Sequence, residues 1–199
     1  QLQCTAAGAF RCYCFWRLVG AAELEGPRTC LQQEGEHFYI HNASGATQEI
    51  VADAHEKSRW KSYPHAGDML HILHQQAART LQAGESLAFA NLLTPHPEIQ
   101  IERLNEMVVK ISDAGETTFL GVGSARLGEL AIEAEIFRIS LVGDRLSLQG
   151  ITELGFAGDE DGYREVFAGV EETLVAGQSE TARRIIAVLE ALVPEAAPP

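Results

Sequence analysis

The sequence is short of positive charge. It carries 15 Lys and Arg residues against 28 Asp and Glu residues, which gives a formal net charge of −13. A surface this acidic repels the phosphate backbone, whose neutralisation by Lys and Arg dominates nucleic-acid affinity. We therefore expect no nucleic-acid partner.

Long hydrophobic runs are also missing. The most apolar stretch, residues 6–22, is interrupted by Arg11 and Arg17. A bilayer span needs about 20 predominantly apolar residues, and a signal peptide places its charged segment before the apolar one. The stretch fits neither pattern, so we interpret it as a strand and expect no membrane partner. Because the chain begins at Gln1 rather than Met, we expect it to be a piece of a longer polypeptide or a processed product.

The sequence lacks a Walker loop, a G-x-S-x-G elbow and an H-E-x-x-H motif. These absences argue against a self-contained nucleotide enzyme, serine hydrolase or zincin. Gly121, Gly123 and Gly128 resemble a dinucleotide loop, but the third glycine is two residues too far along. The following LAIEAEIFRISL favours a strand, whereas that loop requires a helix.

What the sequence does have is period-2 alternation broken by glycines. In residues 36–41, His37, Tyr39 and His41 share one face and Phe38 and Ile40 the other, as in a half-buried strand. On this basis we predict strands at residues 10–19, 29–33, 36–41, 85–93, 107–112, 117–122, 129–141 and 145–148. Turns are expected at residues 20–27, Glu34-Gly35, Gly115, Gly128 and Gly143-Asp144.

The pattern changes after Gly158. Apolar residues recur at helical spacing over residues 163–174, and a second helix is predicted over residues 181–192, with Ser179 as its cap and Pro194 beyond its end. Residues 68–81 fit a helix capped by Asp68 as well as a strand. The expected organisation is a β domain over residues 1–157 and a C-terminal helical segment and tail over residues 158–199.

Three segments resemble one family. FWRLVGAAELEG, EHFYIHN and AGESLAFANLLTPHP follow one another as an aromatic strand, a hairpin and a strand that ends at a Pro-bracketed histidine. In this the chain resembles the C-terminal β-sandwich region of heparinase II/III-like polysaccharide lyases, over roughly residues 10–155. The resemblance implies a mainly β fold, an antiparallel β-sandwich with a C-terminal helical appendage, and a strand at residues 68–81.

The same resemblance implies a function. Such lyases cleave uronate-containing polysaccharides by β-elimination, with the catalytic groups mainly on an N-terminal helical toroid that this chain lacks. The sandwich would act as scaffold and cleft wall, with an acidic polysaccharide as partner and a periplasmic or extracellular location. No complete active site is visible here, so we assign no catalytic residue and expect the chain to be inactive alone.

Candidate substrate-binding residues lie in EKSRWKSYPH, where cations and aromatic rings concentrate. Alternation on an extended segment would put three cations on one side and an indole on the other. The candidates are Lys57, Arg59, Trp60, Lys61, Tyr63 and His65. The competing interpretation is a solvated strand edge protected by charge.

The four cysteines fall at positions 4, 12, 14 and 30, and Cys12 and Cys14 form a C-x-C pair. Structural zinc usually needs pairs spaced C-x(2–4)-C, so core thiols are the favoured interpretation, with a zinc site and a disulfide such as Cys4–Cys30 as alternatives. We predict no cofactor.

Six of the seven histidines lie between positions 37 and 74. On a strand His37 and His41 would stand roughly 13 Å apart, too far to share an ion, whereas His71 and His74 would be neighbours on a helix. The family resemblance implies a zinc held by two His and one Asp, for which His41, Asp53 and His55 are the nearest candidates. Cleft-lining or surface histidines are the favoured interpretation.

Two further functional classes stay open. A non-catalytic carbohydrate-binding or protein-interaction β-sandwich would bind through aromatic platforms such as Trp16, Trp60 and Tyr63. A small metal-dependent β-barrel enzyme would instead use the histidine cluster.

Overall fold

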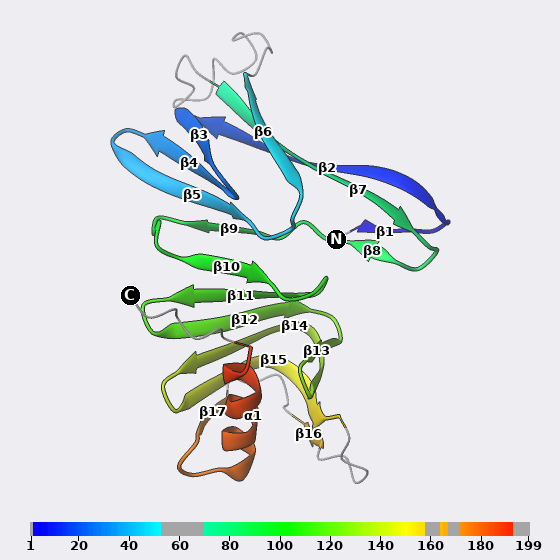
Figure 1. Ribbon diagram of the computed structural model, residues 1–199, viewed down its shortest axis with the longest axis vertical. Helices are drawn as coiled ribbons and strands as arrows, with labels where there is room; N and C mark the ends of the chain where they lie inside the picture. Colours follow the sequence, from blue (N-terminus) through cyan, green and yellow to red (C-terminus); the bar gives the residue numbers. More distant parts are fainter. Residues whose placement is uncertain (1, 53–69, 158–163, 167–171, 193–199) are drawn as a thin grey trace. The chain divides into compact units, whose positions relative to one another are not determined.

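The computed structural model describes residues 2–52, 70–157, 164–166 and 172–192. Its elements are antiparallel strands and, at the C-terminal end, one helix (Figure 1). The prediction of a mainly β chain with antiparallel sheets and a C-terminal helix is confirmed. Contacts divide the chain into two compact units, Gln1–Glu98 and Ile99–Pro199. The β domain expected over residues 1–157 thus spans the whole first unit and part of the second.

The first unit contains β1 to β9. They are β1 (Leu2–Gln3), β2 (Gly8–Val19), β3 (Ala21–Glu25), β4 (Arg28–Gln33), β5 (Glu36–Asn42), β6 (Thr47–Ala52), β7 (Leu70–Leu81), β8 (Ser86–Leu87) and β9 (Asn91–Thr94). Three antiparallel sheets result, with strand orders β2-β7-β6, β3-β4-β5-β9 and β1-β8.

The two larger sheets of this unit form a small sandwich. Alternation sends Leu18 of β2 and Leu73 of β7 inward, where they meet Ile40 of β5 in one buried cluster. Trp16, Ala22, Leu31 and Ile50 pack around that cluster.

A buried amide pair also joins the two sheets. The fully buried Gln75 of β7 donates from Nε2 to Asn91 Oδ1 over 2.7 Å, and Asn91 Nδ2 of β9 donates back to Gln75 Oε1 over 3.0 Å. Each amide thus donates one hydrogen bond to the other and accepts one from it, and this link fixes β7 relative to β9.

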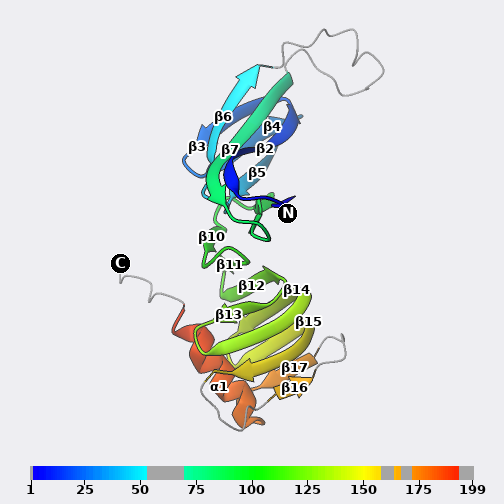
Figure 2. The same cartoon turned by 90° about the vertical axis from the view of Figure 1, so that its right-hand side faces the viewer.

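The second unit is one curved sheet with a helix on one face (Figure 2). Its strands are β10 (Gln100–Arg103), β11 (Val108–Asp113), β12 (Glu116–Val122), β13 (Ala125–Leu127), β14 (Leu130–Val142), β15 (Arg145–Phe156), β16 (Arg164–Val166) and β17 (Glu172–Val175). Helix α1 (Glu180–Glu190) buries Ala182, Ile185, Ile186 and Leu189, the last three in the main core. The helix is therefore part of the core of this unit.

Most strand predictions are confirmed, including the strand rather than the helix for β7 and the two-residue turn at Glu34-Gly35. The predicted cap of α1 is also confirmed, since Ser179 Oγ accepts from Ala182 N over 3.2 Å. The LAIEAEIFRISL segment lies in β14, so the dinucleotide-loop interpretation fails for lack of its helix.

Three sequence predictions are wrong. The turn expected at residues 20–27 contains β3, which forms a hairpin with β4. The single strand expected at residues 85–93 is two short strands that belong to different sheets. The helix expected at residues 163–174 is replaced at its described positions by β16 and part of β17, because both strands pair with β15 and sheet context overrides local periodicity.

A bulge bends the long β14–β15 hairpin. Ala134 pairs with Ile151 and Arg138 with Gln149, so residues 135–137 stand opposite Gly150 alone. Gly150 has φ +70°, and a Cβ there would lie 2.1 Å from Ile136 O. The bend turns Ile136 to solvent and places Phe137 in the core.

We predict that Gly150→Ala destabilises the chain more than Gly143→Ala. Both glycines have positive φ, but a Cβ at Gly143 meets nothing within 4 Å. The difference between the unfolding free energies of the two variants therefore isolates the clash of the Cβ with the backbone. We expect this clash to cost about 1–3 kcal/mol beyond the conformational strain that both variants share. Urea unfolding followed by circular dichroism measures it. Equal destabilisation of the two variants would contradict the described bulge.

Candidate functional site

The predicted substrate-binding residues lie outside the described part of the chain. Lys57, Arg59, Trp60, Lys61, Tyr63 and His65 fall within residues 53–69, between β6 and β7, as do the zinc candidates Asp53 and His55. Trp16, the platform predicted on β2, is half-buried and packs against the core cluster. That interpretation is wrong for Trp16, because its position in the alternation of β2 faces the opposite sheet.

Aromatic rings do gather on the outer face of the β2-β7-β6 sheet. Tyr13 and Phe15 of β2 point outward at alternate positions, with 42% and 62% of their surfaces exposed. His74 of β7 pairs in register with Phe15. Its ring centroid lies 5.1 Å from that of Tyr13 and 4.8 Å from that of Phe15, and all three rings are nearly parallel. We call these three residues the aromatic face.

The two ring nitrogens of His74 have different surroundings. Its Nδ1 lies 2.8 Å from Glu49 Oε1 of the neighbouring strand β6, and its Nε2 is buried without a hydrogen-bond partner in the described structure. The imidazole is thus held as a stacking element of the aromatic face. The sequence signal for this face was the alternation in CYCFWR, which separates Tyr13 and Phe15 from Trp16.

Two arginines and an aliphatic residue border the aromatic face. Arg11 and Arg17 precede and follow Tyr13 and Phe15 on the same side of β2, and both are exposed. Val51 of β6 is 39% exposed. The outer side of the sheet therefore offers apolar rings between cationic groups, in a chain that is acidic as a whole.

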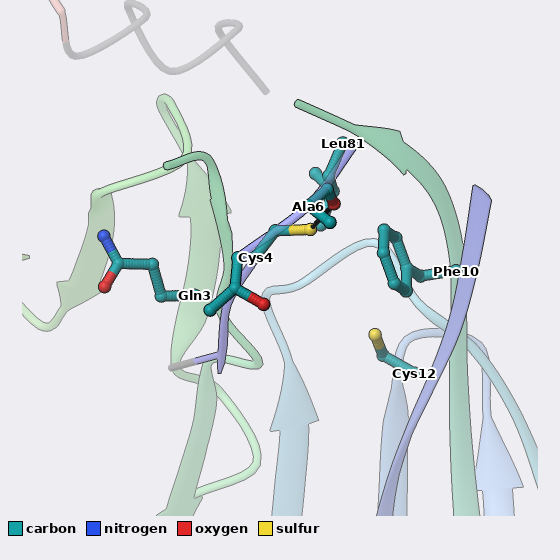
Figure 3. A pocket seen from close by; sticks show the side chains of 7 residues that line it. Gln3, Cys4, Ala6, Phe10, Cys12 and Leu81 are labelled. Carbon is teal, nitrogen blue, oxygen red and sulfur yellow. Dashed lines mark hydrogen bonds between the residues drawn. The ribbon is translucent and has the colours of Figure 1, made fainter. Parts of the chain in front are cut away.

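A cavity of about 260 Å³ lies on the inner side of the β2–β7 pair, at the end where Gly8 pairs with Leu81. Its walls include Ala6, Phe10 and Leu81 and the thiols of Cys4 and Cys12, and Gln3 and Thr5 complete the lining. Figure 3 shows both sulfur atoms on the side of the Phe10 ring and the Gln3 amide directed away from that ring. Cys4 Sγ donates to Ala6 O over 2.6 Å. The lining is chiefly apolar.

The outer face of β4 and β5 carries titratable groups. Cys30 Sγ lies 3.7 Å from His37 Nδ1, and the Arg28 guanidinium lies 5.0 Å from the centre of the Tyr39 ring. Loss of solvation raises the pKa of the Tyr39 phenol, and the neighbouring Cys30 acts in the same direction.

His41 on the same strand is buried, and its Nε2 has no hydrogen-bond partner in the described structure. Burial lowers the pKa of His41, and repulsion by Arg28 lowers it further.

A polar cluster on β12 and β14 satisfies its own hydrogen bonds. Thr118 Oγ1 donates to Glu116 Oε1 over 2.9 Å and lies 2.9 Å from Ser140 Oγ, while Arg138 donates to both Ser140 Oγ and Glu116 Oε1. The hydrogen bond from Thr118, assisted by Ser140 and Arg138, holds the pKa of Glu116 below its ordinary value. We interpret this cluster as structural.

The metal hypotheses find no cluster to support them. No group of three or more His, Cys, Asp or Glu side chains able to hold an ion occurs among the residues that the structure describes. All four cysteines are free, so the Cys4–Cys30 disulfide does not form, and Cys12 and Cys14 share the inner side of β2 as core-facing thiols. His71 and His74 lie on a strand, three positions apart, and so point to opposite faces.

Within the described ranges, no helix is long and apolar enough to span a bilayer. No family model, curated protein or solved structure matches the chain.

We predict that protonation of His41 weakens the fold at acidic pH. Its pKa in the native state lies below the unfolded value of about 6.5, so the unfolded chain binds the proton more readily. Stability from neutral His41 is therefore full above about pH 6.5 and is lost as the pH falls toward the native pKa. His41→Leu should reduce the loss of unfolding free energy between about pH 7.5 and about pH 5.5.

Urea unfolding at the two pH values measures this loss. His96→Leu is the matched control, because the His96 side chain is 60% exposed. The control should lose as much stability as the wild type. If the unfolding free energy of His41→Leu falls between the two pH values as much as that of the wild type, the predicted role of His41 is wrong.

Proposed function

We propose that the chain contacts a glycan without performing chemistry itself, and that the aromatic face is the contact surface. The observation that carries the proposal is the exposure of Tyr13 and Phe15 in a nearly parallel cluster with His74. Exposed rings on a sheet face offer the apolar surface that sugar C–H groups pack against, and such exposed apolar patches mark interaction sites.

The imidazole of the aromatic face is placed for stacking rather than for proton transfer. A β-elimination site needs a Tyr or His within hydrogen-bond reach of the substrate proton. Here His74 Nδ1 is engaged by Glu49, and Nε2 is buried. Neither ring nitrogen is offered to a ligand at the surface, so we assign the imidazole to stacking.

The borders of the face suggest which sugars it suits. Arg11 and Arg17 lie on the outer side of β2 on either side of the two rings. A guanidinium pairs well with carboxylate or sulfate oxygens, so a uronate-containing or sulfated polysaccharide would meet cations at both ends of the rings.

The family resemblance suggests the larger protein to which the chain would belong. Its three segments form β2 with β3, β5, and β8 with β9, which together contribute to every sheet of the first unit. On this resemblance we propose that the chain is the sandwich portion of a heparinase II/III-like polysaccharide lyase, periplasmic or extracellular, where it would act as scaffold and cleft wall beside a helical toroid. The alternative is a carbohydrate-binding or protein-interaction module with no lyase attached. The gene sequence upstream of Gln1 separates the two.

We predict that Phe15→Ala weakens binding of heparin-type or alginate-type hexasaccharides. Loss of one exposed ring contact is worth about 0.5–1.5 kcal/mol, which corresponds to a dissociation constant roughly 2 to 12 times larger. Titration calorimetry measures the constant, and binding should weaken as ionic strength rises, because exposed cation contacts are screened.

Phe38→Ala is the matched control. Phe38 lies on β5 in the other sheet and is 49% exposed, so the same atoms are removed from a comparable environment. The control should bind as the wild type does. If neither hexasaccharide binds the wild type, or if the two variants lose affinity equally, the aromatic face is not the glycan contact, and a protein partner becomes the better hypothesis.

We also predict that the isolated chain does not depolymerise these polysaccharides. The proton-transfer groups are expected on the toroid, and the imidazole of His74 has one nitrogen engaged by Glu49 and the other buried. Absorbance of the unsaturated uronate product is the readout. Steady product formation that is lost in a Tyr63→Phe or His65→Ala variant would place the active site in this chain instead.

A further inference from the structure

The cavity beside Cys4 and Cys12 is separate from the aromatic face. Phe10 and Cys12 alternate with Tyr13 and Phe15 along β2, so the two pairs point to opposite sides of the sheet. An occupant of the cavity therefore does not compete with a ligand on the outer face. Binding in the cavity is thus independent of whether the chain binds a glycan.

Main-chain hydrogen bonds hold the cavity walls in place. Cys4 N donates to Glu85 O, and Gly84 N donates to Cys4 O, each over 2.8 Å. Just before Cys4 in the chain, β1 pairs with β8. Just after the segment that lines the cavity, Gly8 of β2 pairs with Leu81 of β7. The residues before β2 are thereby tied to the turn between β7 and β8, which keeps the space open.

The lining is poorly suited to water. An ordered water needs two to four polar partners, whereas most of the walls here are the side chains of Ala6, Phe10 and Leu81 and two thiols, with Thr5 and the outward-directed Gln3 at the polar part of the lining. The Cys4 thiol already donates to Ala6 O. An apolar occupant would remove these walls from water at no cost in hydrogen bonds.

The size and the sulfur atoms indicate the class of ligand. The space is open to solvent on one side, and its volume of about 260 Å³ is enough for a molecule of one or two rings, since benzene fits a cavity of about 150 Å³. Sulfur packs favourably against the edges of aromatic rings, and the exposed Phe10 ring offers an offset stacking partner. We propose that this cavity binds a small, uncharged aromatic molecule, in contact with Phe10, Leu81 and the Cys12 thiol.

The test uses 1-naphthol as the probe and the cysteines as reporters. Ligand-observed NMR titration of the 199-residue chain should give saturable binding, with the modest affinity expected of so few ligand atoms. Alkylation by iodoacetamide, followed at each cysteine by mass spectrometry, should then slow at Cys12. At a probe concentration ten times the dissociation constant, the rate should fall about 11-fold if the complex does not react.

Cys30 is the internal control for this protection. It lies on β4 beside His37, outside the cavity, and is also partly exposed. Its alkylation rate should not change with the probe. If 1-naphthol does not saturate the wild type, or if Cys30 is protected as much as Cys12, the proposal is overturned.

A filling variant provides the second arm. Ala6→Phe places a ring in the cavity, whereas Ala9→Phe adds the same atoms at an exposed position of β2 that does not line it. Ala6→Phe should abolish both the titration signal and the protection of Cys12, and Ala9→Phe should preserve both. Unchanged binding in a folded Ala6→Phe chain would overturn the assignment of the site. If Ala6→Phe does not fold, the alkylation rates of Cys12 and Cys30 in the wild type, with and without 1-naphthol, still test whether the cavity binds the probe.

Discussion

The antiparallel ladder between β2 and β7 is the constraint on which the candidate sites depend. Its pairs run without interruption from Gly8–Leu81 to Val19–Leu70. Because side chains alternate strictly along such a ladder, one register assigns every residue of β2 to a face. Trp16 and Leu18 go to the core, Tyr13 and Phe15 to solvent, and Phe10 and Cys12 to the cavity. A shift of one residue would exchange the core with the aromatic face.

The sandwich around that ladder has a small apolar core, and polar contacts supplement it. Among the residues that the structure describes, its buried apolar cluster consists of Leu18, Ile40 and Leu73. The Gln75–Asn91 amide pair adds a directional link between the sheets. Apolar contact alone tolerates sliding, whereas two reciprocal hydrogen bonds have one geometry, so the pair favours a single alignment of β7 with β9. The second unit has a much larger apolar cluster that includes three residues of α1.

Many polar side chains among the described residues hydrogen-bond to one another. Where an imidazole meets aromatic rings, its nitrogens are held by Glu49 or buried. Where a hydroxyl meets a carboxylate and a guanidinium, as at Thr118, Glu116 and Arg138, the groups satisfy one another. Two apolar surfaces lie on either side of β2: the exposed rings on its outer side and the cavity walls on its inner side.

The sequence by itself determined the antiparallel β class, most strand positions, the Glu34-Gly35 turn and the Ser179 cap, because these follow from local periodicity and backbone preferences. It also contained the division of β2 into two faces, but not which face was solvated, so Trp16 was placed outside and Phe15 overlooked. Only the tertiary structure decided this, since the inner face is whichever one meets Ile40 of the other sheet. The strands β16 and β17 likewise needed their partner β15, because hydrogen-bond pairing between distant segments leaves no local signal.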